Sequence, residues 1–90
     1  METWCVYVIE LSNDAYYTGI TNNLDRRIKT HSKGKGSAYV KANLPIRNIM
    51  YVEYVANRSE ASKREIEIKN MRRDLKVRLA FSDKNSLRSK

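Results

Sequence analysis

The sequence predicts an α/β (α+β) domain in which a three-stranded antiparallel sheet is flanked by helices. Three runs rich in β-branched and aromatic residues, 4–11, 15–20 and 46–55, have the composition and length of strands. The segments between and after them carry apolar residues at helical spacing behind residues that can cap a helix. A chain of 90 residues fits one domain. We expect that domain to cover 1–82, with a polar, frayed tail over 83–90.

The first two strands are expected to form a hairpin, because the residues at 12–14 are all turn formers. A three-residue loop places the odd-numbered positions of both strands on one face, where Tyr7 and Tyr17 become diagonal neighbours. A loop of two or four residues would put these tyrosines on opposite faces.

A helix is predicted over 22–33, capped by one of its first two asparagines. Leu24 and Ile28 are its apolar anchors, and Arg27 and His31 flank this inward stripe one turn apart. Each polar residue also has an ordinary explanation. The aliphatic stem of Arg27 can pack over the edge of the core. His31, near the C-terminus of the helix, can interact favourably with the negative end of the helix dipole.

Glycines mark the limits of these elements. Gly19 is expected to end the second strand and, without a Cβ, to let backbone or ligand approach closely. Gly34 and Gly36 break the helix, and a short helix over 37–43 ends before Pro45.

Strict alternation along the third strand gives two faces. One would carry Met50, Val52 and Tyr54, and the other Ile49, Tyr51 and Val55. The chain then continues into a helix that ends near Asn70, and into a last, basic helix. The apolar residues of that last helix are Leu75, Val77, Leu79 and Phe81.

Glu65 stands inside the apolar stripe of the helix that follows the capping box of Asn57 and Glu60. Ala61 and Ile68 lie on either side of it along that stripe. A carboxylate on an inward face is costly unless it is paired or binds a metal. Both readings stay open: a salt bridge to an arginine at the edge of the core, or a metal ligand.

The net charge is +8, from 18 Lys and Arg against 10 Asp and Glu, and it points to a polyanion as partner. A basic surface that only keeps the protein in solution is the alternative. The candidate phosphate-backbone contacts are Lys33, Lys35, Lys41, Arg72, Arg73 and Lys76. No base-reading element is recognisable, so sequence specificity needs a protein partner or is absent.

Composition also bears on the compartment. The single cysteine, Cys5, cannot form an intramolecular disulfide, which suits the reducing cytoplasm. No signal peptide and no apolar run of membrane-spanning length is present in the sequence.

Five motifs in order resemble the GIY-YIG nuclease superfamily, in particular its small single-domain, UPF0213-like members. They are Val6-Tyr7-Val8, Tyr17-Thr18-Gly19, Leu24-Asp25-Arg26-Arg27-Ile28 with His31, Lys35-Gly36-Ser37-Ala38-Tyr39, and Ser59-Glu60-Ala61 through Arg64-Glu65 to Ile68-Lys69. Cys5-Val6 stands where the family has Gly-Ile, and Thr18 replaces an isoleucine. The family often has a basic residue soon after the second motif, and residues 20–22 offer none.

The resemblance implies a metal-dependent endonuclease that hydrolyses phosphodiester bonds, in DNA rather than RNA, with a place in DNA repair or recombination. Arg27 would bind the scissile phosphate, and Glu65 would hold one Mg²⁺ or Mn²⁺. Tyr7 would orient or deprotonate the attacking water, assisted by Tyr17 and His31. The alternatives are a non-catalytic nucleic-acid-binding module on the same fold and, less favoured, a protein–protein adaptor.

Overall fold

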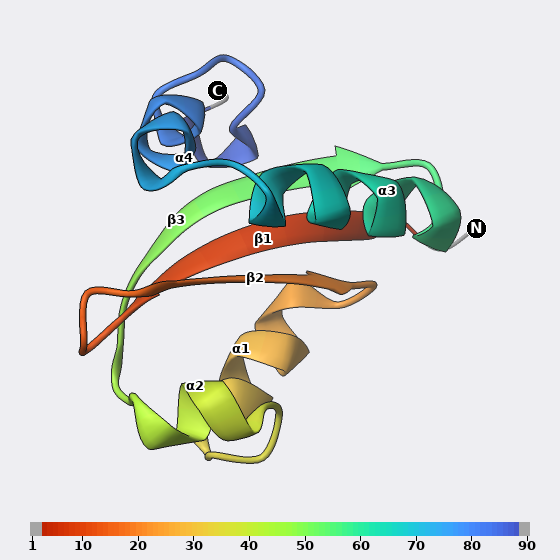
Figure 1. The fold of residues 1–90 in the computed structure, drawn as a ribbon. Helices are drawn as coiled ribbons and strands as arrows, with labels where there is room; N and C mark the ends of the chain where they lie inside the picture. Colours follow the sequence, from red (N-terminus) through yellow and green to blue (C-terminus); the bar gives the residue numbers. More distant parts are fainter. Residues whose placement is uncertain (1–2, 89–90) are drawn as a thin grey trace.

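The computed structural model describes residues 3–88 and contains the predicted three-stranded antiparallel sheet. Its strands are β1 (Trp4–Leu11), β2 (Tyr16–Thr21) and β3 (Ile46–Val55), in the order β2-β1-β3 (Figure 1). The helices are α1 (Leu24–Ser32), α2 (Ala38–Ala42), α3 (Arg58–Lys69) and α4 (Arg73–Ala80), followed by the 3-10 turn η1 (Ser86–Arg88). Among the residues described, no helix is long and apolar enough to cross a membrane.

The sheet separates two helical layers, with α1 and α2 on one face and α3 and α4 on the other (Figure 1). The buried residues of the first face are Cys5, Tyr7, Ile9, Leu11, Val40 and Val52, with Leu24 and Ile28 packed against them. Those of the second face are Val6, Val8, Tyr51, Ala61 and Ile68. Because helices cover both faces of the sheet, both sets of side chains of the middle strand β1 are buried.

The hairpin has the three-residue loop that the sequence favours. Leu11 N donates to Ala15 O at 2.9 Å, Ile9 lies opposite Tyr17, and Tyr7 lies opposite Gly19. The two tyrosines therefore share the face covered by α1, as predicted.

Gly19 does not end the second strand, which was a wrong prediction. Thr21 still pairs with Cys5, and its hydroxyl then accepts from Asn23 N at 3.0 Å. The chain turns there, and Asn23 caps α1 by accepting from Arg26 N at 3.1 Å.

A bulge breaks the alternation of β3. Tyr51 lies opposite Val8, but Ile49 lies opposite Ile9, so Met50 is an extra residue between the two pairs. Ile49 therefore shares the face of Ile9, and the prediction that placed it with Tyr51 was wrong. Strict alternation assumes an unbroken ladder, which this strand does not have.

The C-terminal segment does not fray over its described part. Asn85 is 2% exposed and donates to the carbonyl oxygens of Met50 and Ala80, both at 2.8 Å. Its side-chain oxygen accepts from Val52 N and Leu87 N at 3.1 Å. One buried amide thus fastens the segment to the outer edge of β3. The last two residues of the predicted tail lie outside the described range.

Candidate active site

Tyr7 extends from β1 across the neighbouring strand. Its side chain is fully buried, and it lies against Gly19 so closely that a Cβ there would be 2.4 Å from the Tyr7 hydroxyl oxygen. The glycine is therefore required by the tyrosine. The missing side chain lets the phenol reach over β2 toward α1.

His31 receives that phenol. The Tyr7 hydroxyl oxygen and His31 Nε2 are 2.7 Å apart, and the imidazole is fully buried. The ring of Tyr17 meets the same imidazole edge-on, with 5.4 Å between ring centroids. A Cβ at Gly36 would lie 2.6 Å from His31 Nδ1, so the glycine after the helix closes the other side of the ring.

Arg27 completes this group, which we call the Tyr7–Tyr17–Arg27–His31 cluster. One of its terminal nitrogens donates to the carbonyl oxygen of Gly36 at 3.5 Å, and its side chain is partly buried. Arg27 Nε and His31 Nδ1 are buried without a hydrogen-bond partner. Buried donors without partners are uncommon in folded proteins, and functional sites are one place where they occur.

Burial sets the protonation of the cluster. It raises the pKa of Tyr7 to about 12, although the nearby Arg27 guanidinium opposes this rise. Burial, followed by the charge of Arg27, lowers the pKa of His31 below its usual 6.5. At neutral pH the cluster therefore contains a phenol and a neutral imidazole. Arg27 lies beside the Tyr7 hydroxyl and can only donate to its oxygen, so the consistent arrangement has Tyr7 donating its own O–H to His31 Nε2.

Glu65 lies on α3, which packs against the opposite face of the sheet. Its side chain is 22% exposed and lies 3.4 Å from the ammonium group of Lys69. Within residues 3–88 it forms no hydrogen bond or ion pair with the Tyr7–Tyr17–Arg27–His31 cluster. Four of the five predicted catalytic residues are thus gathered together, and the fifth is not in contact with them.

The rotation of α3 determines which way Glu65 faces. Arg64 Nε lies 3.0 Å from a carboxylate oxygen of Glu53 on β3, and Tyr51 donates to that same oxygen. Residues 64 and 65 are about 100° apart around a helix. The buried Ala61 and Ile68 lie between their two directions, so Glu65 is on the flank away from Glu53 and β3, which is the β2 side. The sequence pattern left Glu65 open to an arginine partner, but that partner belongs to Glu53, a residue that sequence reasoning had not singled out.

The predicted phosphate contacts fall in both layers. Lys33, Lys35 and Lys41 are exposed on the α1–α2 side. On the other side, Arg72 lies 3.5 Å from Asp74, Arg73 stands over the ring of Tyr16 at 4.1 Å, and Lys76 is half-buried. The contact between Arg73 and Tyr16 had no signal in the sequence, because it joins residues far apart in the chain.

Comparison with known proteins shows which family the chain belongs to. The family model for the GIY-YIG catalytic domain matches residues 3–78. The chain belongs to the GIY-YIG family. The UPF0213 protein CPE1444 of Clostridium perfringens is 39% identical over 77 residues, which are 86% of this chain and 82% of that protein. A UPF0213 protein of Bacillus cereus is 40% identical over 72 residues, 80% of this chain and 74% of that protein.

A solved structure agrees with the fold. The solution NMR structure of the UPF0213 protein BH0048 from Bacillus halodurans has a TM-score of 0.57 and 32% identity. The match covers 94% of this chain and 89% of that one. The chain is thus a small GIY-YIG protein of the UPF0213 type, as the resemblance in its motifs predicted.

A GIY-YIG protein raises the question of a metal ion. Residues 3–88 contain no group of three or more His, Cys, Asp or Glu side chains that could hold one. Magnesium keeps several waters and needs only one or two carboxylates. Glu65 fits that requirement, since its present partner is an exposed lysine that a cation would displace.

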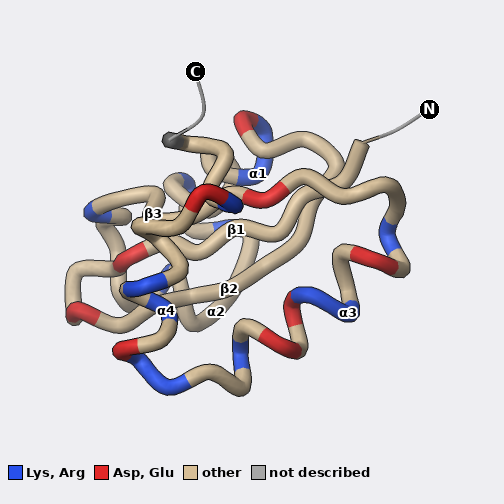
Figure 2. Tube along the Cα trace, turned by 90° about the horizontal axis from the view of Figure 1, so that it is seen from above, with Lys and Arg blue, Asp and Glu red and all other residues tan. Residues whose placement is uncertain are grey.

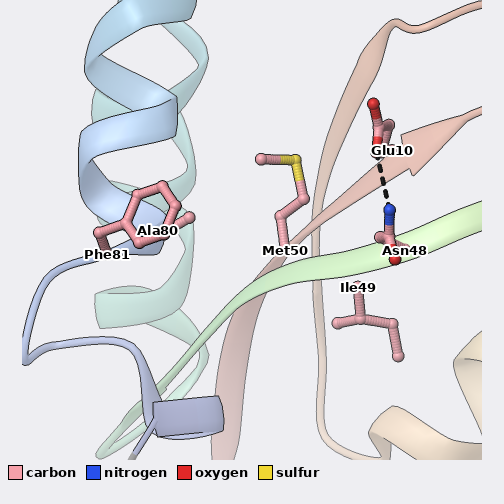
Figure 3. A pocket seen from close by; sticks show the side chains of 6 residues that line it. All are labelled: Glu10, Asn48, Ile49, Met50, Ala80 and Phe81. Atoms are coloured by element: carbon pink, nitrogen blue, oxygen red, sulfur yellow. Dashed lines mark hydrogen bonds between the residues drawn. The ribbon is translucent and has the colours of Figure 1, made fainter.

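A groove of about 570 Å³ lies elsewhere on this GIY-YIG domain, between α4 and the bulge of β3 (Figure 3). Its lining residues are Glu10, Asn48, Ile49, Met50, Ala80 and Phe81. Asn48 donates to Glu10 at 2.9 Å, and the other four side chains are apolar. With no Lys or Arg among its lining residues, the groove has no group suited to a phosphate.

Proposed function

We propose that this chain is a metal-dependent endonuclease that hydrolyses phosphodiester bonds in nucleic acid, DNA in preference to RNA, in DNA repair or recombination. The observation that carries the proposal is the cluster itself: a partly buried guanidinium beside a buried phenol that is hydrogen-bonded to a neutral histidine. It combines a cation for phosphate with a path for a proton.

Arg27 would bind the non-bridging oxygens of the scissile phosphate and stabilise the charge that builds up on them. One of its terminal nitrogens makes only a long, 3.5 Å hydrogen bond to the Gly36 carbonyl oxygen, which a phosphate oxygen could replace. A bidentate guanidinium suits phosphate better than an ammonium group does.

Tyr7 would act as a relay. Because its pKa is raised to about 12, Tyr7 is protonated at neutral pH and is not present as a phenolate. Substrate binding would have to open the cluster, because the phenol is fully buried. The attacking water admitted there would give a proton to the phenol oxygen while the phenol passes its own proton to His31 Nε2. Tyr17 would hold the imidazole in place. The final proton acceptor is then a neutral histidine, a better base than a phenol near neutral pH.

Glu65 would hold one Mg²⁺ or Mn²⁺ at the β2 side of α3. The ion, when bound, lowers the pKa of its water and neutralises phosphate charge. The single buried cysteine is consistent with a reducing compartment, and we place the activity in the cytoplasm.

The test is a cleavage assay over a panel of DNA and RNA structures with Mg²⁺, with Mn²⁺ and with EDTA. Metal-dependent cutting of at least one substrate is the expected result. A non-catalytic nucleic-acid-binding module is the second candidate, favoured by the separation of Glu65 from the cluster. Tight, salt-sensitive binding without cutting would select it.

A further inference from the structure

The two edges of the sheet differ. The outer edge of β3 is occupied by Asn85, whereas β2 pairs only with β1. Figure 1 shows β2 at the open side of the molecule, between α3 on one face and α1 on the other. An open edge strand presents unpaired N–H and C=O groups.

The register tells which groups these are. Val52 N–H donates to Asn85, so it points away from β1. Val52 lies opposite Tyr7, so the backbone groups of Tyr7 point the other way and bond to Gly19. The bond from Leu11 N to Ala15 O fits the same alternation. The N–H groups of Thr18 and Ile20 therefore point away from β1, about 7 Å apart. Thr18 is only 3% exposed, whereas Ile20 is half-buried, so the Ile20 N–H is the one that a ligand can reach.

Guanidinium groups flank this edge from both faces. On the face covered by α1, Arg27 belongs to the cluster in which Tyr7 crosses Gly19. On the face covered by α3 and α4, Arg73 lies over the ring of Tyr16, the first residue of β2, with 4.1 Å between its guanidinium carbon and the ring centroid. Arg73 is exposed and forms no ion pair with any described residue, so its N–H groups are available to a ligand.

Two carboxylates, those of Glu10 and Glu65, lie near this edge and would affect an anion bound there. Glu10, opposite Tyr16, accepts from Asn48 at 2.9 Å. Glu65 faces β2 and carries its charge toward a ligand there unless a cation neutralises it. The edge therefore suits an anion with regularly spaced charges that arrives together with a divalent cation.

We propose that a phosphodiester strand of nucleic acid runs along the free edge of β2. Its phosphates accept hydrogen bonds from the N–H group of Ile20 and from Arg73, which Tyr16 positions. Arg73 thereby supplies a cation for this strand that residues 20–22 lack. The inference rests on the proposed function for the nature of the ligand, and it concerns binding only.

The first test measures affinity by fluorescence polarisation. The probe is a labelled DNA with a 12-base-pair duplex and a 12-nucleotide overhang, and every protein carries Glu65→Gln to prevent cutting. Arg73→Ala should weaken binding about 3–10-fold and reduce the salt slope by about 1. Tyr16→Leu, which keeps the apolar packing, should weaken binding about 2–5-fold through loss of the cation–π contact.

Arg58 provides the matched control. It stands over the ring of Trp4 at 5.6 Å, at the other end of the sheet, and Arg58→Ala makes the same charge change. It should alter affinity less than about twofold. Equal losses for Arg58→Ala and Arg73→Ala, no loss for Arg73→Ala, or no binding by the parent protein at 50 mM salt would overturn the proposal.

The second test reads the backbone directly. In a ¹⁵N-resolved NMR titration with the same DNA, the amide of Ile20 should shift more than those of β3. An unmoved Ile20 amide in a protein that cuts DNA would sink this inference and leave the nuclease proposal standing. Shifted amides in a protein that never cuts would do the reverse.

Discussion

Arg27 and His31 lie one turn apart on α1, but their environments give them different chemistry. Arg27 keeps one unpartnered donor and one weak bond to a backbone carbonyl, whereas His31 is fully enclosed by two tyrosines and a glycine. The first can reach a ligand and the second can only exchange protons with Tyr7. Residue type gave the candidates, and burial separates their roles.

Arg27→Ala should lower turnover by about 10²–10³, the scale for losing one positioned donor to a developing oxyanion. The measurement is a single-turnover cleavage rate with saturating enzyme. Arg47→Ala is the control, because this arginine is exposed and paired with Asp14 at the hairpin turn. Equal rates for Arg27→Ala and wild type would remove Arg27 from the site.

The lowered pKa of His31 has a consequence for stability. The folded protein holds the imidazole neutral, while the unfolded chain binds a proton at the usual 6.5. Folding stability from this site is therefore fully present above pH 6.5 and is lost as pH falls through the depressed folded pKa. Denaturant melts of wild type and His31→Gln between pH 8 and pH 5 should show a wild-type loss that is absent in the variant. Parallel curves would contradict the buried neutral histidine.

At the scale of elements, two glycines shape the site by leaving room. Gly19→Ala would place a methyl group 2.4 Å from the hydroxyl oxygen of Tyr7. We expect a loss of roughly 1–3 kcal/mol in the free energy of unfolding, as for other overpacked cores. Urea melts would measure it. In a Tyr7→Leu background the shorter side chain should remove most of that cost, and additive effects would argue against the contact.

An ion pair between Arg64 and Glu53 joins α3 to β3. Arg64 is 17% exposed, and it bonds Glu53 at 3.0 Å and Glu67 at 2.9 Å. Arg64→Met should cost roughly 1–3 kcal/mol, because Glu53 and Tyr51 lose their partner in a mostly buried setting. Lys63→Met, which removes an exposed pair 3.7 Å from Glu60, should cost less than about 0.5 kcal/mol. Thermal melts of both variants would show whether the two costs differ.

The sequence predicts some features of the helices and strands better than others. Local periodicity and turn length predicted the three strands, apart from the end of β2, and the common face of Tyr7 and Tyr17. They also predicted the cap at Asn57 and a cap on α1 by one of its first two asparagines, which is Asn23. The bulge at Met50 was missed, because it depends on pairing between distant strands. So was the anchoring of Asn85, a polar residue in a polar segment whose partners lie far along the chain.

The site shows the same limit. The pattern could place Arg27 and His31 on one helix face, and it could mark Glu65 as a costly inward carboxylate. It could not show that a sheet separates them, since a helical stripe does not reveal which face of the sheet it covers. The raised pKa of Tyr7 likewise depends on how the layers pack, because burial outweighs the opposing charge of Arg27.

At the scale of the whole molecule, the positive charge is unevenly compensated. Lys and Arg alternate with Asp and Glu along α3 (Figure 2), where Lys63, Arg64 and Lys69 each pair with a glutamate of the same helix. On the α1–α2 side, Arg26, Lys29, Lys33, Lys35 and Lys41 form no ion pair within the described residues. A polyanion should therefore be held mainly from the α1–α2 side.

The stripe on α1 has a suitable length. Residues 26, 29 and 33 lie on one outward face and span about 10 Å along the helix axis. The stem of Lys41 packs against Gly34, which brings α2 up to the end of that stripe. Cations placed so can contact successive phosphates without moving the core.

The prediction is a charge-reversal comparison. Lys33→Glu/Lys41→Glu should weaken DNA binding at least tenfold and lower the slope of log Kd against log salt by about 2, since each phosphate contact contributes close to one unit. Arg58→Glu/Lys63→Glu changes the net charge by the same amount on the opposite layer, and it should alter the slope by less than about 1. Fluorescence polarisation between 50 and 200 mM salt gives both slopes. Equal slopes for the two double variants would mean that only the overall charge attracts the polyanion, and that the α1–α2 side has no special part in holding it.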